Sequence, residues 1–261
     1  MKGLFRVLII LLFTASCTGI DAEPAQNKVG VLNIDGGDSV VEIANFPVAG
    51  LSVQESRVRR AAVKVLAQYG HGSGIYMMIR GFPVVITAAH VVSDPGTIMY
   101  KVSSGEGEVV DAVRIYFDEK IDVSVLLLGS KMKTRDYIKY QKSNSISKVG
   151  TRLIYSGYPS SHELLTIRGM VAGYGTVGRE TVVLMHGYGW FGCSGSGIFD
   201  EVGNFVGILW GVDIEGVAGL PQVIEDIIWI TPANRIDYNA ILKGACMSSG
   251  STRHMCKKYI E

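Results

Sequence analysis

Short apolar segments separated by turn residues recur along most of this chain. Residues 61–69 form the first such segment, and two more follow at 75–79 and 82–88, with glycine-containing stretches between them. Apolar runs of similar length continue at 97–102, 108–116, 122–128, 151–156, 164–171, 181–186, 197–200, 204–210 and 227–230. Most are bounded by Gly, Pro, Asp or Ser, which is typical of β-strands joined by tight turns. Many short strands at close spacing predict an all-β barrel or sandwich.

The predicted strands fall into two groups of similar size. The polar segment 131–148, rich in Lys and Ser, separates residues 56–130 from residues 149–230 and is predicted to be a linker. The glycine-containing stretch 71–74 is predicted to interrupt the first group. The pattern therefore predicts two consecutive β-domains.

One helix is predicted near the C-terminus, at 231–244. Thr231 offers an N-cap and Pro232 suits the first helical position. Residues 245–261 are predicted to form a polar tail, and residues 23–55 an extension ahead of the first β-domain.

Composition and charge narrow the class of protein. The chain has 261 residues, of which 48% are hydrophobic and 32 are glycine, as expected for a turn-rich globular protein. Its formal net charge of +1 gives no sign of nucleic-acid binding.

The N-terminus has the pattern of an export signal. Lys2 and Arg6 precede an apolar run, Val7 to Ala15, that is too short to span a bilayer. Residues 1–22 are therefore predicted to be a signal segment, and the protein is predicted to be exported to a periplasmic or extracellular location. Cys17 follows the run in a context that resembles a bacterial lipoprotein processing box, so lipidation at Cys17 with membrane anchoring is an alternative to release after an ordinary cleavage.

The remaining cysteines allow one disulfide. Cys246 and Cys256 lie close together in the polar tail, and an oxidising compartment would permit a bridge between them. Cys193 would then be a free thiol. No spacing of His and Cys is typical of a zinc site, and no metal or cofactor is expected.

Two stretches carry the candidate chemistry. Thr87–His90 reads Thr-Ala-Ala-His at the end of an apolar strand, and Gly192–Gly197 reads Gly-Cys-Ser-Gly-Ser-Gly. Serine is a poor nucleophile at neutral pH unless a base takes its proton, which a histidine can do. Glycines beside the serine allow a tight turn whose N–H groups point at an oxyanion.

With Ile121–Leu128 and Gly207–Gly211, these stretches resemble the chymotrypsin-like (trypsin-like) serine proteases of the compact bacterial and viral type. The resemblance covers roughly residues 61–243 and follows the family order of His, Asp and Ser. It implies an all-β fold of two packed six-stranded antiparallel β-barrels with a C-terminal helix.

The resemblance also assigns roles to residues. It implies a catalytic triad of His90, Asp122 and Ser194, with the N–H groups of Gly192 and Ser194 as the oxyanion hole. Asp118 and Asp111 are competitors for the acid, although only Asp122 leads directly into an apolar strand. Ser196 and Cys193 are less suitable nucleophiles, because neither has the Gly-x-Ser-Gly frame. The other histidines are expected in loops or on the surface.

Substrate-binding positions follow from the same resemblance. Leu209, Trp210 and Gly211 are expected to pair with the substrate backbone, and Tyr188 to lie near the base of the primary pocket. With no charge there, cleavage after apolar or small residues is predicted. Asp226 could favour a basic residue instead, and His162 or His186 an acidic one. Cys193 stands where trypsin-type zymogens place an aspartate, so activation through a freed N-terminus is not expected.

The sequence thus predicts a serine endopeptidase that acts on polypeptides. The alternative is a catalytically silent protease-like module that binds peptides or a partner. An α/β-hydrolase esterase is excluded by the order of the motifs and the lack of alternating helices.

Overall fold

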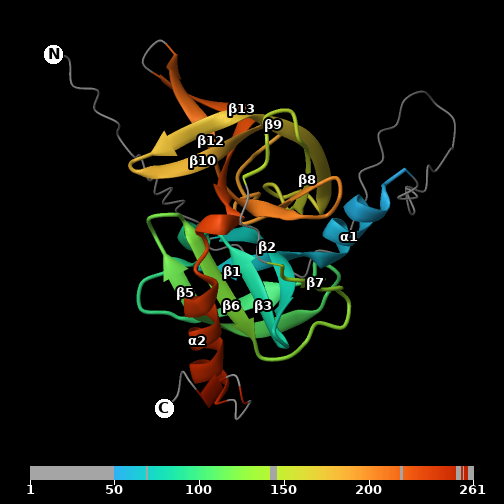
Figure 1. Ribbon diagram of the computed structural model, residues 1–261, viewed down its shortest axis with the longest axis vertical. Helices are drawn as coiled ribbons and strands as arrows, with labels where there is room; N and C mark the ends of the chain where they lie inside the picture. The colour runs from blue at the N-terminus through green and yellow to red at the C-terminus, as the bar shows by residue number, and fades with distance from the viewer. Residues whose placement is uncertain are drawn as a thin grey trace, which may run out of the picture. The chain divides into compact units, whose positions relative to one another are not determined.

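Six antiparallel strands from the first half of the chain close into a barrel. The structure is a computed structural model that describes residues 50–68, 70–141, 146–217, 220–250, 254 and 256–257. The barrel strands are β1 (Ala62–Ala67), β2 (Gly70–Ile79), β3 (Phe82–Thr87), β4 (Met99–Ser103), β5 (Val109–Asp118) and β6 (Val123–Leu128). They pair in the order β1-β4-β5-β6-β3-β2, and the pairing of β1 with β2 closes the ring (Figure 1). Its interior is filled by side chains such as Val63, Val65, Tyr76, Val85 and Leu126.

A second closed barrel follows in the chain. Its strands are β8 (Arg152–Gly157), β9 (Leu165–Val177), β10 (Glu180–His186), β11 (Gly197–Asp200), β12 (Phe205–Val217) and β13 (Leu220–Pro232). They pair in the order β10-β13-β12-β11-β8-β9. The prediction of two six-stranded antiparallel barrels is confirmed. The β12–β13 hairpin is longer than predicted, because its strands stay paired out to Val217 and Leu220.

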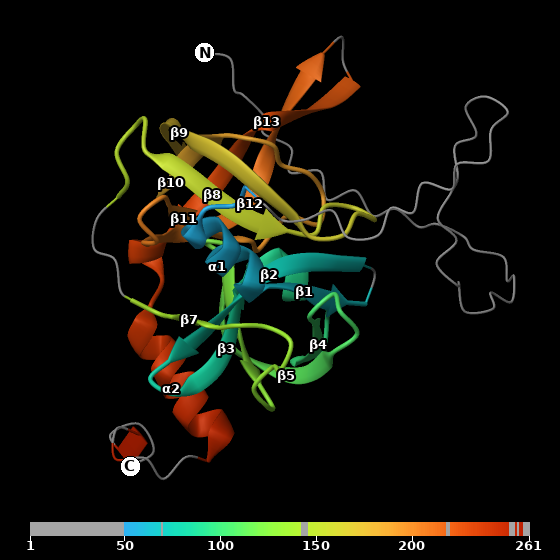
Figure 2. The same ribbon diagram turned by 90° about the vertical axis from the view of Figure 1, so that its right-hand side faces the viewer.

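An apolar cluster joins the two barrels. It includes Ile75 and Ile86 from the first barrel and Ile154, Phe199 and Ile208 from the second, all of them buried. Figure 2 shows the barrels stacked with this junction between them. Residues from both barrels therefore lie close together at this junction, and the candidate site is located there.

Two details of the first half differ from the prediction. The stretch 71–74 does not interrupt a strand, since β2 begins at Gly70 and pairs with β1 through that stretch. The predicted linker contains a short strand, β7 (Ile138–Lys139), which pairs in parallel with β2. Two residues are too few to give a recognisable sequence pattern, and the main chain of β2 provides the partners.

The C-terminal helix is present, but at other bounds than 231–244. Thr231 and Pro232 end β13, paired with Ile208 and Gly207, and a 3₁₀ turn over Ala233–Arg235 follows. Helix α2 (Tyr238–Ser249) begins after Asp237, whose carboxylate accepts from two main-chain N–H groups of the first turn. Pairing within the barrel thus outweighs the Thr-Pro signal, and the helix starts at the next good cap.

The helix also runs beyond Gly244 into the predicted polar tail. Gly244 lies inside the helix, and it is glycine because a Cβ at that position would lie 2.3 Å from the carbonyl oxygen of Ile115 on β5. The end is Gly250, in the left-handed conformation. Figure 1 shows α2 alongside the first barrel, although it follows the second barrel in sequence.

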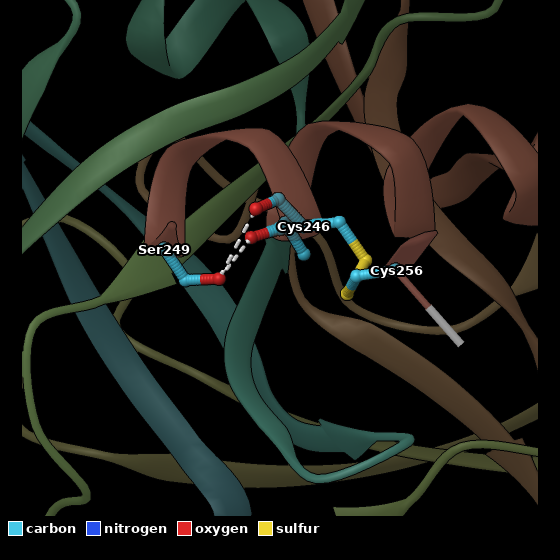
Figure 3. Close-up of a disulfide and its surroundings, with 4 residues drawn as sticks. Cys246, Ser249 and Cys256 are labelled. Carbon is cyan, nitrogen blue, oxygen red and sulfur yellow. Dashed lines mark hydrogen bonds between the residues drawn. A yellow bond between two sulfur atoms is a disulfide. The ribbon is translucent and has the colours of Figure 1, made fainter. Parts of the chain in front are cut away.

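A disulfide fastens the end of this helix. Cys246 and Cys256 are bonded and fully buried, with their Cα atoms 5.3 Å apart (Figure 3). Ser249 lies beside them and donates to the carbonyl oxygens of Ala245 and Cys246. The bridge allowed by the cysteine count is present, and Cys193 is a free, buried thiol.

Residues 1–22, with Cys17, and most of the predicted extension 23–55 lie outside the described residues. The signal segment, export and lipidation therefore stay predictions. No helix among the residues that the structure describes is long and apolar enough to cross a membrane.

A helix that the sequence analysis missed, α1 (Val53–Ala61), precedes the first barrel. Ser52 and Glu55 form a reciprocal capping box at its start. Glu55 is 3% exposed and forms an ion pair with Arg168 on β9 of the second barrel. At the other end of the helix, Arg59 donates to the carbonyl oxygen of Leu164 at 2.8 Å. Helix α1 thus ties the start of the first barrel to the second.

The Glu55–Arg168 pair predicts a pH-dependent contribution to stability. Hydrogen bonding to Arg168, aided by Ser52 and opposed by burial, lowers the pKa of Glu55 from 4.5 to about 2. Because the pKa is lowered on folding, the stabilisation is present above about pH 4.5 and is lost as the pH falls toward 2. We expect Arg168→Gln to lower the free energy of unfolding at pH 7, because the buried carboxylate of Glu55 would lose its charged partner.

Urea unfolding at a series of pH values measures this effect. The difference between the wild type and Arg168→Gln should shrink below pH 4.5 and vanish near pH 2. Arg152→Gln is the matched control, because its ion pair with Glu201 is 3.5 Å long and exposed on both sides. An Arg168→Gln effect that is the same at pH 7 and pH 2.5 would contradict the assignment.

Candidate active site

The histidine of the first stretch lies just beyond the end of β3. Thr87 ends the strand, and a 3₁₀ turn over Ala89–Val92 carries His90. The neighbours Ala88, Ala89 and Val92 are buried, whereas the His90 side chain is 50% exposed. The apolar neighbours fix the turn, and the imidazole remains open to a substrate.

Asp122 holds this histidine by two hydrogen bonds. One carboxylate oxygen lies 2.7 Å from His90 Nδ1, and the other accepts the main-chain N–H of His90 at 2.9 Å. The Asp122 side chain is 7% exposed and its backbone is left-handed, with φ of 50°. Asp tolerates this conformation better than most residues. The carboxylate therefore fixes both the ring and the main chain of His90.

The competing aspartates have other partners. Asp118 accepts from the N–H of Lys120 at 2.9 Å and from the hydroxyl of Tyr116 at 3.3 Å. Asp111 forms an exposed ion pair with Lys101. Of the three predicted candidates, Asp122 is the one bound to His90.

Ser194 lies in a tight turn between β10 and β11 that is closed by its own main chain. Cys193 N–H donates to the carbonyl of Trp190 at 2.9 Å, and Ser196 N–H to that of Cys193 at 3.0 Å. Gly195, at φ of 91°, donates to the carbonyl of Leu209 on β12 at 2.8 Å. The turn is thus held against the strand that carries the predicted substrate-binding residues.

The same turn packs against the first barrel, next to the start of the 3₁₀ turn that carries His90. Ser73 N–H on β2 donates to the carbonyl of Ser194 at 2.8 Å. A Cβ at Gly195 would lie 2.1 Å from the carbonyl oxygen of Ser73 and 2.9 Å from the nitrogen of Ala88, so glycine is required there. These contacts bring Ser194 to the side of the junction where His90 lies.

In this structure the Ser194 hydroxyl is not bonded to His90. Its Oγ donates to the carbonyl of Trp210 at 3.4 Å, which is a long hydrogen bond. Within the described part of the chain, the main-chain N–H groups of Gly192 and Ser194 donate to no acceptor. The neighbouring carbonyls are engaged, that of Phe191 by Ser160 N–H at 2.6 Å and that of Gly192 by the Ser73 hydroxyl at 2.7 Å. Both N–H groups are therefore free to bind an oxyanion.

A family model, the trypsin-like peptidase domain, matches residues 72–208, just over half of the chain and including all three of these side chains. The chain belongs to the trypsin-like peptidase family.

Solved structures support the same fold. A crystal structure of Rv3671c from M. tuberculosis H37Rv, a serine-to-alanine mutant in an inactive form, is 15% identical with a TM-score of 0.55, covering 77% of this chain and 92% of that chain. A second structure, of the Rv3671c protease in an inactive form, is 17% identical with a TM-score of 0.55 and covers 76% and 93%. No curated protein matches the sequence.

Neutral groups hold the turn Gly192–Ser196, which carries the predicted nucleophile Ser194 and is called the nucleophile turn below. Cys193 is fully buried, and its Sγ lies 3.6 Å from the hydroxyl of Tyr155 on β8. Burial raises the pKa values of both the thiol and the phenol, so both stay protonated at neutral pH. The Tyr155 hydroxyl also donates to the carbonyl of Tyr188. One side chain thus links the nucleophile turn to the segment predicted to form the primary pocket.

The predicted substrate-binding residues lie on β12 and in the segment before the nucleophile turn. Leu209 is buried, and both its N–H and its carbonyl bond to the turn. Trp210 is the extra residue of a β-bulge between Leu209 and Gly211, and open space surrounds the Cα of Gly211. Tyr188 is 37% exposed. Binding of substrate by these residues stays a prediction.

The charged residues that would give the pocket a basic or acidic specificity lie on the surface. The side chains of Asp226, His162 and His186 are exposed. The main-chain carbonyl of Asp226 accepts the N–H of Gly187 at 2.9 Å, which links β13 to the segment that follows β10. His71 is half-buried, and its Nε2 lies 3.0 Å from the carbonyl oxygen of Tyr158. Ser196 is fully buried, and its hydroxyl has no partner among the described residues.

Sequence reasoning missed several residues that support the site. Thr231 on β13 donates to the carbonyl of Ile121 at 2.5 Å and so holds the residue before Asp122. Ser73 and Tyr155 contact the nucleophile turn from two different strands. No motif marks these residues, although the sequence Gly-Ser-Gly around Ser73 is a visible signal, predicted above only to interrupt the first group of strands.

Proposed function

We propose that this chain is a serine endopeptidase that hydrolyses peptide bonds through an acyl-enzyme on Ser194. The supporting observation is the pair of hydrogen bonds between Asp122 and His90. They lie beside a turn in which the main-chain N–H groups of Gly192 and Ser194 have no acceptor among the described residues. A carboxylate at Nδ1 stabilises the tautomer with the proton on Nδ1, which leaves Nε2 as a base.

The proposed reaction begins when Ser194 Oγ attacks the carbonyl carbon of the peptide bond. His90 Nε2 takes the hydroxyl proton, and the N–H groups of Gly192 and Ser194 bind the oxyanion. Collapse of the tetrahedral intermediate breaks the C–N bond, and the imidazolium gives its proton to the leaving amine. Water then attacks the acyl carbon while His90 takes one of its protons. The C–O bond to Ser194 breaks, and His90 returns the proton to Ser194 Oγ.

The hydrogen bond of Ser194 to Trp210 does not oppose this reaction. Attack requires a rotation of the serine side chain about its Cα–Cβ bond, away from a carbonyl at 3.4 Å. Catalytic hydrogen bonds are often long or absent without substrate and tighten in the complex. The bond therefore does not favour the alternative, a catalytically silent peptide-binding module.

The specificity we propose is for apolar or small residues before the cleaved bond. Among the residues that the structure describes, the buried charged residues are Glu55 and Asp122, and Asp226, His162 and His186 are exposed. Leu209–Gly211 would bind the substrate backbone as an added strand, with affinity that depends little on sequence.

A fluorophosphonate probe tests the function, because it reacts with an activated serine. The full chain should be labelled, peptide mapping should place the label on Ser194, and a peptide library should be cut mainly after apolar or small residues. Labelling of Ser196 or Cys193 would overturn the assigned nucleophile, and absence of labelling and cleavage would favour the silent module. Cleavage mainly after Lys or Arg, or after Glu, would overturn the proposed specificity alone.

A further inference from the structure

A buried serine of the first barrel touches the nucleophile turn of the second. Ser73 on β2 has no exposed surface. Its hydroxyl donates to the carbonyl of Gly192 at 2.7 Å and accepts the main-chain N–H of Tyr158 at 2.9 Å. Tyr158 directly follows β8, so one side chain joins the first barrel to two segments of the second.

The main chain of Ser73 adds two more links. Its N–H donates to the carbonyl of Ser194 at 2.8 Å, and its carbonyl accepts the Thr87 hydroxyl at 2.7 Å. The carbonyls of Gly192 and Ser194 are therefore both bound by the same residue. Thr87, in turn, ends the strand that leads to His90.

The turn needs such an outside contact. Gly192 has φ of 93° and, as glycine, little intrinsic preference that would hold its main chain in one orientation. The direction of its N–H depends on the Phe191–Gly192 peptide, whose carbonyl is held by Ser160 N–H at 2.6 Å. The Ser73 hydroxyl fixes the other side of the same glycine through its carbonyl.

We propose that Ser73 is a positioning residue for the oxyanion hole. By binding the carbonyls of Gly192 and Ser194, it sets the direction and spacing of the two N–H groups that face the oxyanion. The inference rests on the proposed function, and it adds a side chain that acts through the main chain of the turn without touching the substrate.

Steady-state kinetics of Ser73→Ala in the full chain test the proposal. The oxyanion is present in the transition state and absent from the bound substrate, so kcat should fall while KM changes little. Loss of one oxyanion donor costs about 10²–10³ in kcat, and a displaced donor should cost less, about 10–100-fold. Affinity for a peptide boronate, whose tetrahedral adduct places an oxygen in the hole, should fall by a similar factor.

Ser156→Ala is the matched control. Ser156 is a buried serine on β8 whose hydroxyl pairs with that of Thr166 at 3.0 Å, on the opposite face of the strand from Gly157. It should lower the melting temperature as Ser73→Ala does, and leave kcat within about threefold. Ser73→Cys keeps a weak donor at the same place and should give an intermediate kcat. It also serves as the second variant if the alanine chain does not fold.

The outcomes are separable. A wild-type chain without turnover or fluorophosphonate labelling would contradict the proposed function, and this inference with it. An active wild type in which Ser73→Ala keeps full kcat would overturn the inference alone, as would equal losses of kcat in the Ser73 and Ser156 variants.

Discussion

Ser194→Ala should lower kcat by about 10⁶-fold and abolish fluorophosphonate labelling. The expected loss is this large because the variant has no group that can form the acyl-enzyme, and what remains is the contribution of the oxyanion hole and substrate binding. The fold should be kept, since the main-chain bonds of the turn, from Ser73 N–H and from Gly195 N–H, do not involve the lost hydroxyl. Initial rates of peptide cleavage, with melting temperature as the check on folding, measure the effect.

Ser196→Ala is the control for this prediction. Ser196 lies two positions further on in the same turn; it is fully buried, whereas Ser194 is partly exposed, and its hydroxyl has no hydrogen-bond partner among the described residues. Its loss should change kcat by no more than about threefold, because no hydrogen bond is broken. A large loss of activity in Ser196→Ala together with an active Ser194→Ala would move the nucleophile to Ser196.

Asp122→Asn should lower kcat by about 10⁴-fold at neutral pH, the loss known for this exchange in a Ser-His-Asp protease. The asparagine oxygen can still accept the main-chain N–H of His90, which Asp122 now does at 2.9 Å. Its NH₂ group would face Nδ1, now 2.7 Å from the carboxylate, and can only donate there. The ring would then carry its proton on Nε2, where it cannot take one from Ser194. Asn also tolerates the left-handed backbone at this position, so the fold should be kept.

Asp118→Asn separates this effect from a general change of charge. Asp118 accepts from Lys120 N–H and from Tyr116, in the same turn and with no contact to His90. Its replacement should change kcat by less than about threefold, as expected away from the reacting groups. The reverse ranking of the two variants would move the acid of the triad to Asp118.

The contact between Cys193 and Tyr155 bears on how the enzyme would be activated. In a zymogen of the trypsin type, an aspartate before the nucleophile receives a freed N-terminal amine. Here Cys193 occupies that position, with its thiol buried against the Tyr155 hydroxyl. The turn is held by groups already present in the folded chain, and we predict that no new N-terminus is needed to form it.

Sequence patterns identified the elements that are continuous or nearly continuous apolar runs. The run Val84–Ile86, which leads to the histidine turn, is apolar throughout, and the run that starts at Val123 is apolar except for Ser124; both are buried barrel strands. The pairing of His90 with Asp122 was predicted from the family order of motifs, and the structure places the two in contact. The pattern failed for α1, whose helix depends on a capping box and on an ion pair to β9, and for β7, whose two residues depend on β2.

The ends of elements were also decided by distant partners. Thr231 and Pro232 have the local pattern of a helix start, but Thr231 pairs with Ile208 and donates to Ile121 in the other barrel. Gly244 has the local pattern of a helix end, but it lies inside α2, where β5 passes too close for any side chain and so accounts for the glycine. A local preference of about 1 kcal/mol is smaller than the packing that opposes it.

By itself, then, the sequence determined the two-barrel class, the order of the three candidate catalytic side chains and the glycine-rich turn, because each of these depends on short stretches of the chain. The tertiary structure decided which groups support them. Ser73, Tyr155 and Thr231 reach the site from strands far away in sequence, and each acts through a main-chain carbonyl, an atom that every residue has. A contact with such an atom leaves no signature in the residue that is contacted, so only the fold reveals it.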